Sequence, residues 1–113
     1  MTQSLDLSVL EDLANHDTAK VRKYALLFVS SLEEVLVLID GGIARADIAL
    51  LGSMGHRAKS TARNIGATAL ADQCLRLEEA AKANDAATAF ALAQGLRALF
   101  LPVRAELLAH LKG

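Results

Sequence analysis

The sequence predicts an all-α protein, an antiparallel up-down four-helix bundle with a short additional helix at the N-terminus. Three observations favour this fold class. Ala and Leu dominate a chain of 113 residues with a single proline, and these residues lose little side-chain freedom in a helix. Apolar residues recur at helical spacing in five segments, and no segment alternates as a strand would. The length suits one domain, spanning residues 1–113.

The chain begins with a short helix, expected over residues 5–14, which a polar break ends. Asp17 follows that break and is a good N-cap, because its carboxylate can accept a hydrogen bond from an amide of the next turn. The second helix is therefore expected over residues 18–39. The successive glycines Gly41 and Gly42 are expected to end it, since glycine is common just past a helix C-terminus.

A third and a fourth helix follow with short connections. The third is expected over residues 45–65 and should stop at Gly66. The fourth is expected over residues 69–83, with Thr68 as its N-cap. Short connections between long helices make neighbouring helices antiparallel, which is why the sequence predicts an up-down bundle.

The fifth helix is expected to begin after Asp85, a further N-cap, and to run to about residue 111. Pro102 falls inside it. Because proline lacks an amide hydrogen and clashes with the preceding turn, a kink is expected around residues 98–101.

Composition and charge exclude several classes of function. A net charge of −1 gives no reason to expect a nucleic-acid or anionic-membrane partner. No uninterrupted apolar run approaches the ~18 residues that a membrane span needs, and the opening residues lack the pattern of a signal peptide. The lone Cys74 excludes an internal disulfide and a CxxC pair, and is expected in the core. We therefore expect a cytoplasmic protein that does not insert into a membrane.

The third helix carries the candidate site. Its apolar side should face the core and consists of Ile48, Leu51, Gly55, Ala58, Ala62 and Ile65. His56 lies roughly 130° from the centre of that side on a helical wheel, so it should be exposed. Around it, small residues precede the histidine and cationic or hydroxylic residues follow it. These neighbours are Ala49, Gly52, Ser53, Lys59, Ser60 and Arg63.

Two interpretations of this face remain open. The small residues could admit a bulky partner to the ring, with cations placed where an anion on the ring would sit. Alternatively, Gly52 and Gly55 could serve helix packing, with His56 an ordinary surface residue. Each glycine costs roughly 1 kcal/mol relative to alanine inside a helix. Under either interpretation, the two glycines must provide a benefit that offsets this cost.

The segment from His56 to Ala67 resembles the signature of histidine phosphotransfer (HPt) domains. That signature is His-x-x-Lys-Gly followed by small residues, with a glycine ten positions after the histidine. The segment CLRLE, residues 74–78, is similar to the family's Cys-x-x-Leu-Glu segment, and the opening LDLSVLEDLAN to its N-terminal cap. Two positions depart from the family: Ser60 replaces the usual glycine, and Ala58 a larger apolar residue. Both are small, so His56 stays accessible while partner preference could differ.

The resemblance implies a phosphocarrier of two-component signalling. A receiver domain would donate a phosphoryl group from its aspartate to His56, and a second receiver would take it. Lys59 would stabilise the phosphate charge, with Arg63 secondary. The docking surface would consist of Ala49, Gly52, Ser53, Arg57 and Ser60. No cofactor or metal is expected on this chain; Mg²⁺ is expected on the receiver, because phosphoryl transfer needs such a cation and no acidic trio lies beside His56.

The chain lacks both GxGxxG and the Walker pattern, so it is not expected to act alone as an ATP-dependent kinase, and a monomer is expected. A histidine-kinase dimerisation hairpin would have an acidic residue where Arg57 stands and a proline well before Pro102. A metal or haem bundle would need inward Glu-x-x-His ligands, which are missing. His16 and His110 are expected to be ordinary surface residues. A helical adaptor without chemistry remains the alternative, which a phosphorylation assay would decide.

Overall fold

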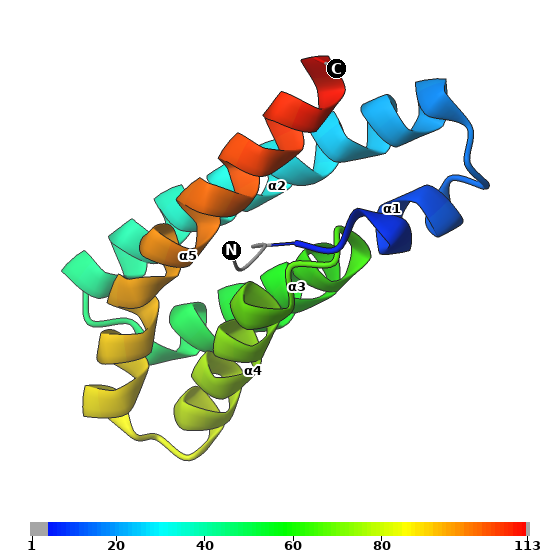
Figure 1. Cartoon of the computed structure of the whole chain (residues 1–113). Coiled ribbons are helices and arrows are strands. Elements are labelled where there is room, and N and C mark those ends of the chain that lie inside the picture. Colours follow the sequence, from blue (N-terminus) through cyan, green and yellow to red (C-terminus); the bar gives the residue numbers. More distant parts are fainter. Residues whose placement is uncertain (1–4, 113) are drawn as a thin grey trace.

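The computed structural model describes residues 5–112, which contain five α-helices and no strand (Figure 1). The helices are α1 (Leu7–Leu13), α2 (Thr18–Ala44), α3 (Ile48–Asn64), α4 (Thr68–Lys82) and α5 (Ala86–Lys112). The four long helices form an antiparallel up-down bundle in which each contacts the next along the chain and α5 closes on α2. This confirms the predicted fold class. The remaining residues of the expected domain, 1–4 and 113, lie outside the described range.

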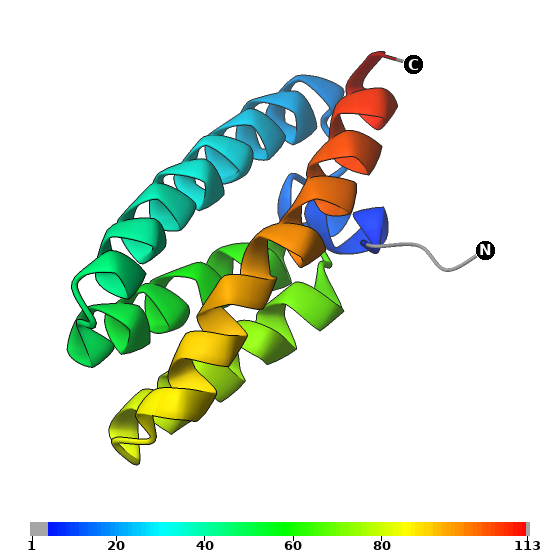
Figure 2. The same cartoon turned by 90° about the vertical axis from the view of Figure 1, so that its left-hand side faces the viewer.

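The short helix α1 closes one end of the bundle. Helices α2 and α5 have 27 residues each, whereas α3 and α4 have 17 and 15, so the α2–α5 pair extends beyond the α3–α4 hairpin (Figures 1 and 2). Helix α1 lies beside this extension and contacts α2 and α3. The amide of Asp6 donates a hydrogen bond to the carbonyl of Gly66 (2.9 Å), which ties the N-terminal segment to the α3–α4 turn.

Gly66 is required at that turn for two reasons. Its φ of +71° lies in the left-handed region, which costs a residue with a Cβ atom free energy. A Cβ atom there would also overlap the backbone of Asp6. The predicted stop of the third helix at Gly66 is therefore confirmed, with α3 ending at Asn64.

Aspartate carboxylates cap four of the five helices. The caps of α2 and α5 were predicted: Asp17 accepts from the amide of Lys20 (3.1 Å), and Asp85 from that of Thr88 (3.3 Å). Asp6 and Asp47 cap α1 and α3 in the same way. The predicted cap of the fourth helix is wrong, because Thr68 is already its first residue. The N-cap position belongs to Ala67, which is fully buried. A polar side chain there would lose its hydration, which costs free energy.

The glycine pair was predicted to end the second helix, and this prediction is wrong. Helix α2 continues through Gly41 and Gly42 to Ala44, and the turn follows at Ala46, whose φ is +53°. Gly42 is buried, and a Cβ atom there would lie 2.9 Å from a methyl group of Leu51 on α3. The glycine therefore lets α2 and α3 approach closely, and α3 starts three residues later than predicted.

Helix α5 continues without interruption past Pro102. The kink expected around residues 98–101 stays a prediction. Among the described residues, α5 is the one helix long and apolar enough to cross a membrane by length and composition alone. Arg97 interrupts the apolar residues of α5, so this helix contains no uninterrupted apolar run of the length that a membrane span needs. Core helices of soluble proteins pass the same test, and α5 packs against α2, α3 and α4, so this is weak evidence for a membrane span. Its buried residues are Ala89, Ala93, Leu96, Phe100, Val103 and Leu107.

Candidate functional site

His56 lies in the middle of α3 with its side chain 69% exposed. The opposite side of the helix faces the core, with Leu51, Ala58 and Ala62 almost completely buried. The orientation predicted from the helical wheel is confirmed. The ring is fixed on a rigid helix and is open to a partner.

The two glycines beside His56 serve the packing of α3 against α4. A Cβ atom at Gly55 would lie 2.8 Å from the carbonyl oxygen of Cys74, and one at Gly52 would lie 2.6 Å from Cβ of Ala81. Both glycines are buried. The prediction that places Gly52 on the exposed face is therefore wrong, and a long side chain there would disturb the two helices.

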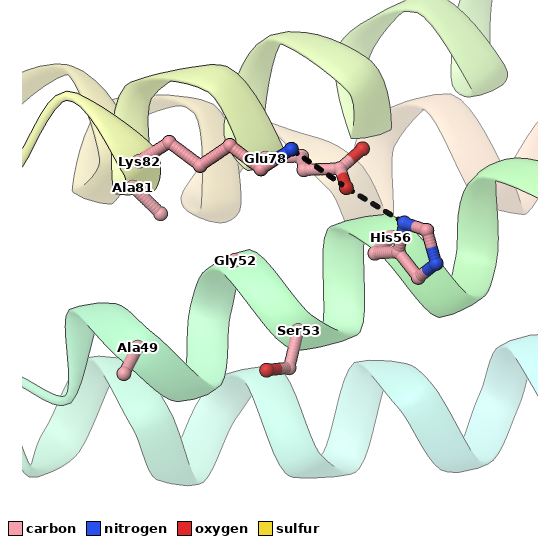
Figure 3. A pocket seen from close by; sticks show the side chains of 7 residues that line it. All are labelled: Ala49, Gly52, Ser53, His56, Glu78, Ala81 and Lys82. Atoms are coloured by element: carbon pink, nitrogen blue, oxygen red, sulfur yellow. Dashed lines mark hydrogen bonds and ion pairs between the residues drawn. The ribbon is translucent and has the colours of Figure 1, made fainter.

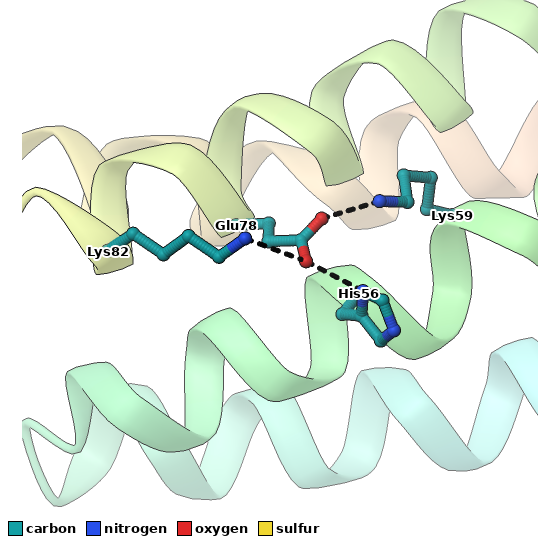
Figure 4. Close-up of polar contacts among 4 residues, drawn as sticks. All are labelled: His56, Lys59, Glu78 and Lys82. Atoms are coloured by element: carbon teal, nitrogen blue, oxygen red, sulfur yellow. Dashed lines mark hydrogen bonds and ion pairs between the residues drawn. The ribbon is translucent and has the colours of Figure 1, made fainter.

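The close approach of α3 and α4 brings Glu78 to the ring of His56 (Figure 4). One carboxylate oxygen, Oε2, lies 2.6 Å from Nδ1 of His56, and the other, Oε1, lies 2.6 Å from Nζ of Lys59. Lys82, one turn further along α4, places its Nζ 3.7 Å from Oε2. The Glu78 side chain is only 9% exposed, so two lysines and the histidine compensate a buried carboxylate.

The hydrogen bond from Lys59 holds the pKa of Glu78 well below its usual range, at about 2, with the bond to His56 adding to the effect and burial opposing it. Glu78 is therefore ionised at neutral pH. An ionised carboxylate can only accept hydrogen bonds, so the hydrogen in the short contact belongs to Nδ1. A neutral imidazole carries one N–H, which leaves a lone pair on Nε2, the nitrogen that points away from Glu78 (Figure 4).

Lys59 was predicted to lie on the exposed face of His56, and this prediction is wrong. Its side chain is only 15% exposed, because the residue lies on the α4 side of α3 and its ammonium group binds Glu78. Arg57 is partly exposed and pairs with Glu34 of α2 at 3.1 Å. The other predicted neighbours, Ala49, Ser53, Ser60 and Arg63, are exposed.

A pocket of about 370 Å³ opens beside His56, between the N-terminal half of α3 and the C-terminal end of α4 (Figure 3). Small residues shape most of it, and a lysine lies at one side. Its lining consists of Ala49, Gly52, Ser53, His56, Glu78, Ala81 and Lys82. The small residues that precede His56 therefore give a partner room next to the ring.

Glu78 and Lys82 were not predicted to take part in the site. Glu78 could have been identified from the resemblance, because the segment CLRLE ends at this residue. Lys82 could have been identified from its i, i+4 spacing to Glu78 on one helix. What the sequence lacks is the rotation of α4 relative to α3, which decides that both side chains face His56.

The other singled-out residues lie away from the ring. Cys74 is buried as predicted, and burial raises the pKa of its thiol to about 11. His16 is exposed near the α1–α2 turn, with Nε2 3.1 Å from a carboxylate oxygen of Asp12, and His110 is exposed near the end of α5. Within residues 5–112, no group of three or more histidine, cysteine or acidic side chains is arranged to hold a metal ion.

Comparison with known proteins decides the class. The family described as "Hpt domain" matches residues 23–111. The chain belongs to the Hpt domain family. This Hpt domain is also similar to the crystal structure of histidine-containing phosphotransfer protein B (HptB) from Pseudomonas aeruginosa PAO1. The TM-score is 0.90 at 27% sequence identity, over 99% of this chain and 97% of that one. No curated protein matches the sequence.

The predicted class of function is confirmed by these similarities. The Hpt domain is a histidine-containing phosphotransfer protein of phosphorelays, in two-component signalling. Proteins of this family interact with receiver domains or histidine kinases, and they are soluble. The geometry around His56 has the parts that this function needs, an exposed imidazole and a group that orients it.

Proposed function

We propose that His56 is the phosphoacceptor of this Hpt domain and that Nε2 is the atom that carries the phosphoryl group. One observation carries the proposal: Oε2 of the buried Glu78 lies 2.6 Å from Nδ1 of the exposed His56 ring. A proton on Nδ1 satisfies this contact and leaves the lone pair of the neutral imidazole on Nε2. The carboxylates that face His16 are exposed ones, with Nε2 3.1 Å from Asp12 and Nδ1 3.9 Å from Glu11, and His110 is exposed near the end of α5.

The transfer reaction then needs few contributions from this chain. Nε2 attacks the phosphorus of an aspartyl phosphate on a receiver domain, the Nε2–P bond forms, and the P–O bond to the aspartate breaks. The electron pair of that bond leaves with the carboxylate. A second receiver reverses the step. Such transfers depend mainly on positioning and charge stabilisation, and Mg²⁺ is expected on the receiver. Glu78 supplies positioning by fixing the ring.

We further propose that Lys59 assists transfer and that Arg63 has a secondary role. Lys59 is bound to Glu78 at 2.6 Å, so it acts by holding that carboxylate against the ring of His56. Arg63 lies exposed two turns after His56 and can add positive charge near an anion on the ring.

Lys59→Ala is expected to slow transfer from a phosphorylated receiver about ten- to a hundredfold, because one charge-assisted hydrogen bond is worth on the order of 1.5–3 kcal/mol. Single-turnover kinetics measures this. Lys82→Ala is the matched control, since the Lys82 side chain is 76% exposed and its Nζ is more distant from Glu78, and its effect should be smaller. An unchanged rate in Lys59→Ala would remove the role of this lysine.

The docking surface that we propose for the receiver consists of the exposed residues around the ring and the pocket beside it. Its residues are Ala49, Ser53, His56, Arg57 and Ser60. Gly52 contributes only as the floor of the pocket. We expect the domain to act in the cytoplasm. We also expect a monomer, because the core is closed within one chain, and gel filtration at micromolar concentration should show a single chain.

The relay itself provides the test. The domain is incubated with a phosphorylated receiver, repurified, and mixed with a second, unphosphorylated receiver. We expect the label to pass to the domain and then to the second receiver. A helical adaptor, the alternative function, would bind a receiver without acquiring the label.

A further inference from the structure

We propose that the charge of Glu78 keeps Nδ1 of the phosphorylated ring protonated and thereby keeps the phosphoryl group on His56 labile. This inference rests on the proposed function, since it concerns the state after Nε2 has accepted the phosphoryl group. It assigns Glu78 a second role beyond orientation, that of a positioning residue that sets the reactivity of the intermediate.

The contact between Glu78 and the ring dictates this protonation state. Once Nε2 is bonded to phosphorus, a neutral ring would carry a lone pair on Nδ1. That lone pair would face the lone pairs of Oε2 at 2.6 Å, which is repulsive. A proton on Nδ1 replaces the repulsion with a charge-assisted hydrogen bond.

Glu78 cannot easily turn away from the ring. Its other oxygen is held by Lys59 at 2.6 Å, and its side chain is only 9% exposed. The charged groups that face Glu78 are His56 and Lys59 from α3 and Lys82 from α4. The carboxylate therefore stays in place while the ring changes state.

The neighbouring helix α2 does not contribute a competing charge to the ring. Its acidic residue at this level, Glu34, binds the guanidinium group of Arg57 at 3.1 Å. Glu78 is thus the acidic group in contact with the imidazole.

The retained proton determines how the phosphoryl group leaves. When the Nε2–P bond breaks toward a receiver aspartate, a ring that carries Nδ1–H takes the electron pair and departs as neutral imidazole. A ring without that proton would depart as the much more basic imidazolide anion. In the proposed cycle the same proton stays on Nδ1 during loading and unloading, so no net proton transfer accompanies either step.

The test compares the loss of the phosphoryl group from the wild-type domain and from Glu78→Gln as a function of pH. Both are loaded with phosphoramidate, a small donor that needs no receiver. The midpoint is the pH at which the hydrolysis rate is half its maximum. We expect it to be lower by about one unit or more in Glu78→Gln than in the wild type. Above the wild-type midpoint, the phosphoryl group of the variant should therefore have an about tenfold longer lifetime. The reason is that the glutamine amide can donate a hydrogen bond to an unprotonated Nδ1.

Glu34→Gln is the matched control, because it removes the same charge one helix away without touching the ring, and its midpoint should equal that of the wild type. Equal midpoints in wild type and Glu78→Gln would overturn the proposal, as would an equal shift in Glu34→Gln. A wild-type domain that phosphoramidate does not label at His56 would instead contradict the proposed function.

A second measurement needs no variant and decides the question if Glu78→Gln does not fold. Nitrogen-15 NMR of the phosphorylated wild-type domain at pH 8 reports whether Nδ1 carries a proton. We expect the shift of a protonated nitrogen, and the same measurement on free phosphohistidine provides the unprotonated reference. A shift equal to that reference would overturn the proposal.

Discussion

Replacing His56 by glutamine is expected to abolish labelling of the domain by a phosphorylated receiver. Glutamine is similar in size and polar, but its side chain has no lone-pair nitrogen that could form a bond to phosphorus. The wild-type label should be lost in acid and retained in base, as expected for a phosphorus–nitrogen bond. Quantifying the label after gel electrophoresis measures the effect.

His16→Gln and His110→Gln are the matched controls for this variant. Both residues are exposed histidines outside the His56–Glu78 pair, so both variants should be labelled as strongly as the wild type. Full labelling of His56→Gln would refute the assignment of the phosphoacceptor.

Ser53→Arg is expected to slow transfer from a receiver on the order of a hundredfold while the fold stays intact. Ser53 is exposed and lines the pocket beside His56, so a long side chain would stand where the partner must approach the ring. Small misplacements of reacting groups already cost rates of this order. Exposed substitutions away from special contacts change stability by only about 0.5 kcal/mol, so circular dichroism should show an unchanged melt.

Two controls separate blocked docking from damaged chemistry. Ser53→Arg should still be labelled by phosphoramidate at the normal rate, because that donor is small enough to reach the ring. Ala91→Arg introduces the same side chain on an exposed position of α5 and should not affect transfer. A normal rate of transfer to Ser53→Arg from the receiver would show that this surface is not the docking site.

Much of this fold could be predicted because helical periodicity is a local property of the sequence. The spacing of Leu51, Ala58 and Ala62 determines which side of α3 faces the core, and the same wheel places His56 outside. The caps Asp17 and Asp85 could be predicted for the same reason, since a cap binds an amide three residues away.

Apart from the N-cap of the fourth helix, the errors concern contacts between helices. Gly42 could end a helix or let two helices approach, and the deciding atom is a methyl group of Leu51 on α3. Gly52 poses the same ambiguity, which Ala81 of α4 resolves in favour of packing. Sequence spacing within one helix holds no information about these neighbours.

The charge arrangement at the site was missed for a related reason. Lys59 and Glu78 are separated by the α3–α4 turn, and their contact depends on how far α4 is rotated after Gly66. The wheel of α3 alone therefore placed Lys59 on the surface beside His56. The resemblance to HPt domains identified the histidine, but the orientation of its ring required the carboxylate on the second helix.

NMR can identify both the residue and the atom that are phosphorylated in the wild-type domain. The domain is enriched in nitrogen-15, phosphorylated by a cognate receiver, and its histidine rings are assigned by NMR with phosphorus-31 coupling. We expect phosphorus to couple to Nε2 of His56 and to no other nitrogen. Coupling to Nδ1 of His56, or to a ring of His16 or His110, would contradict this expectation.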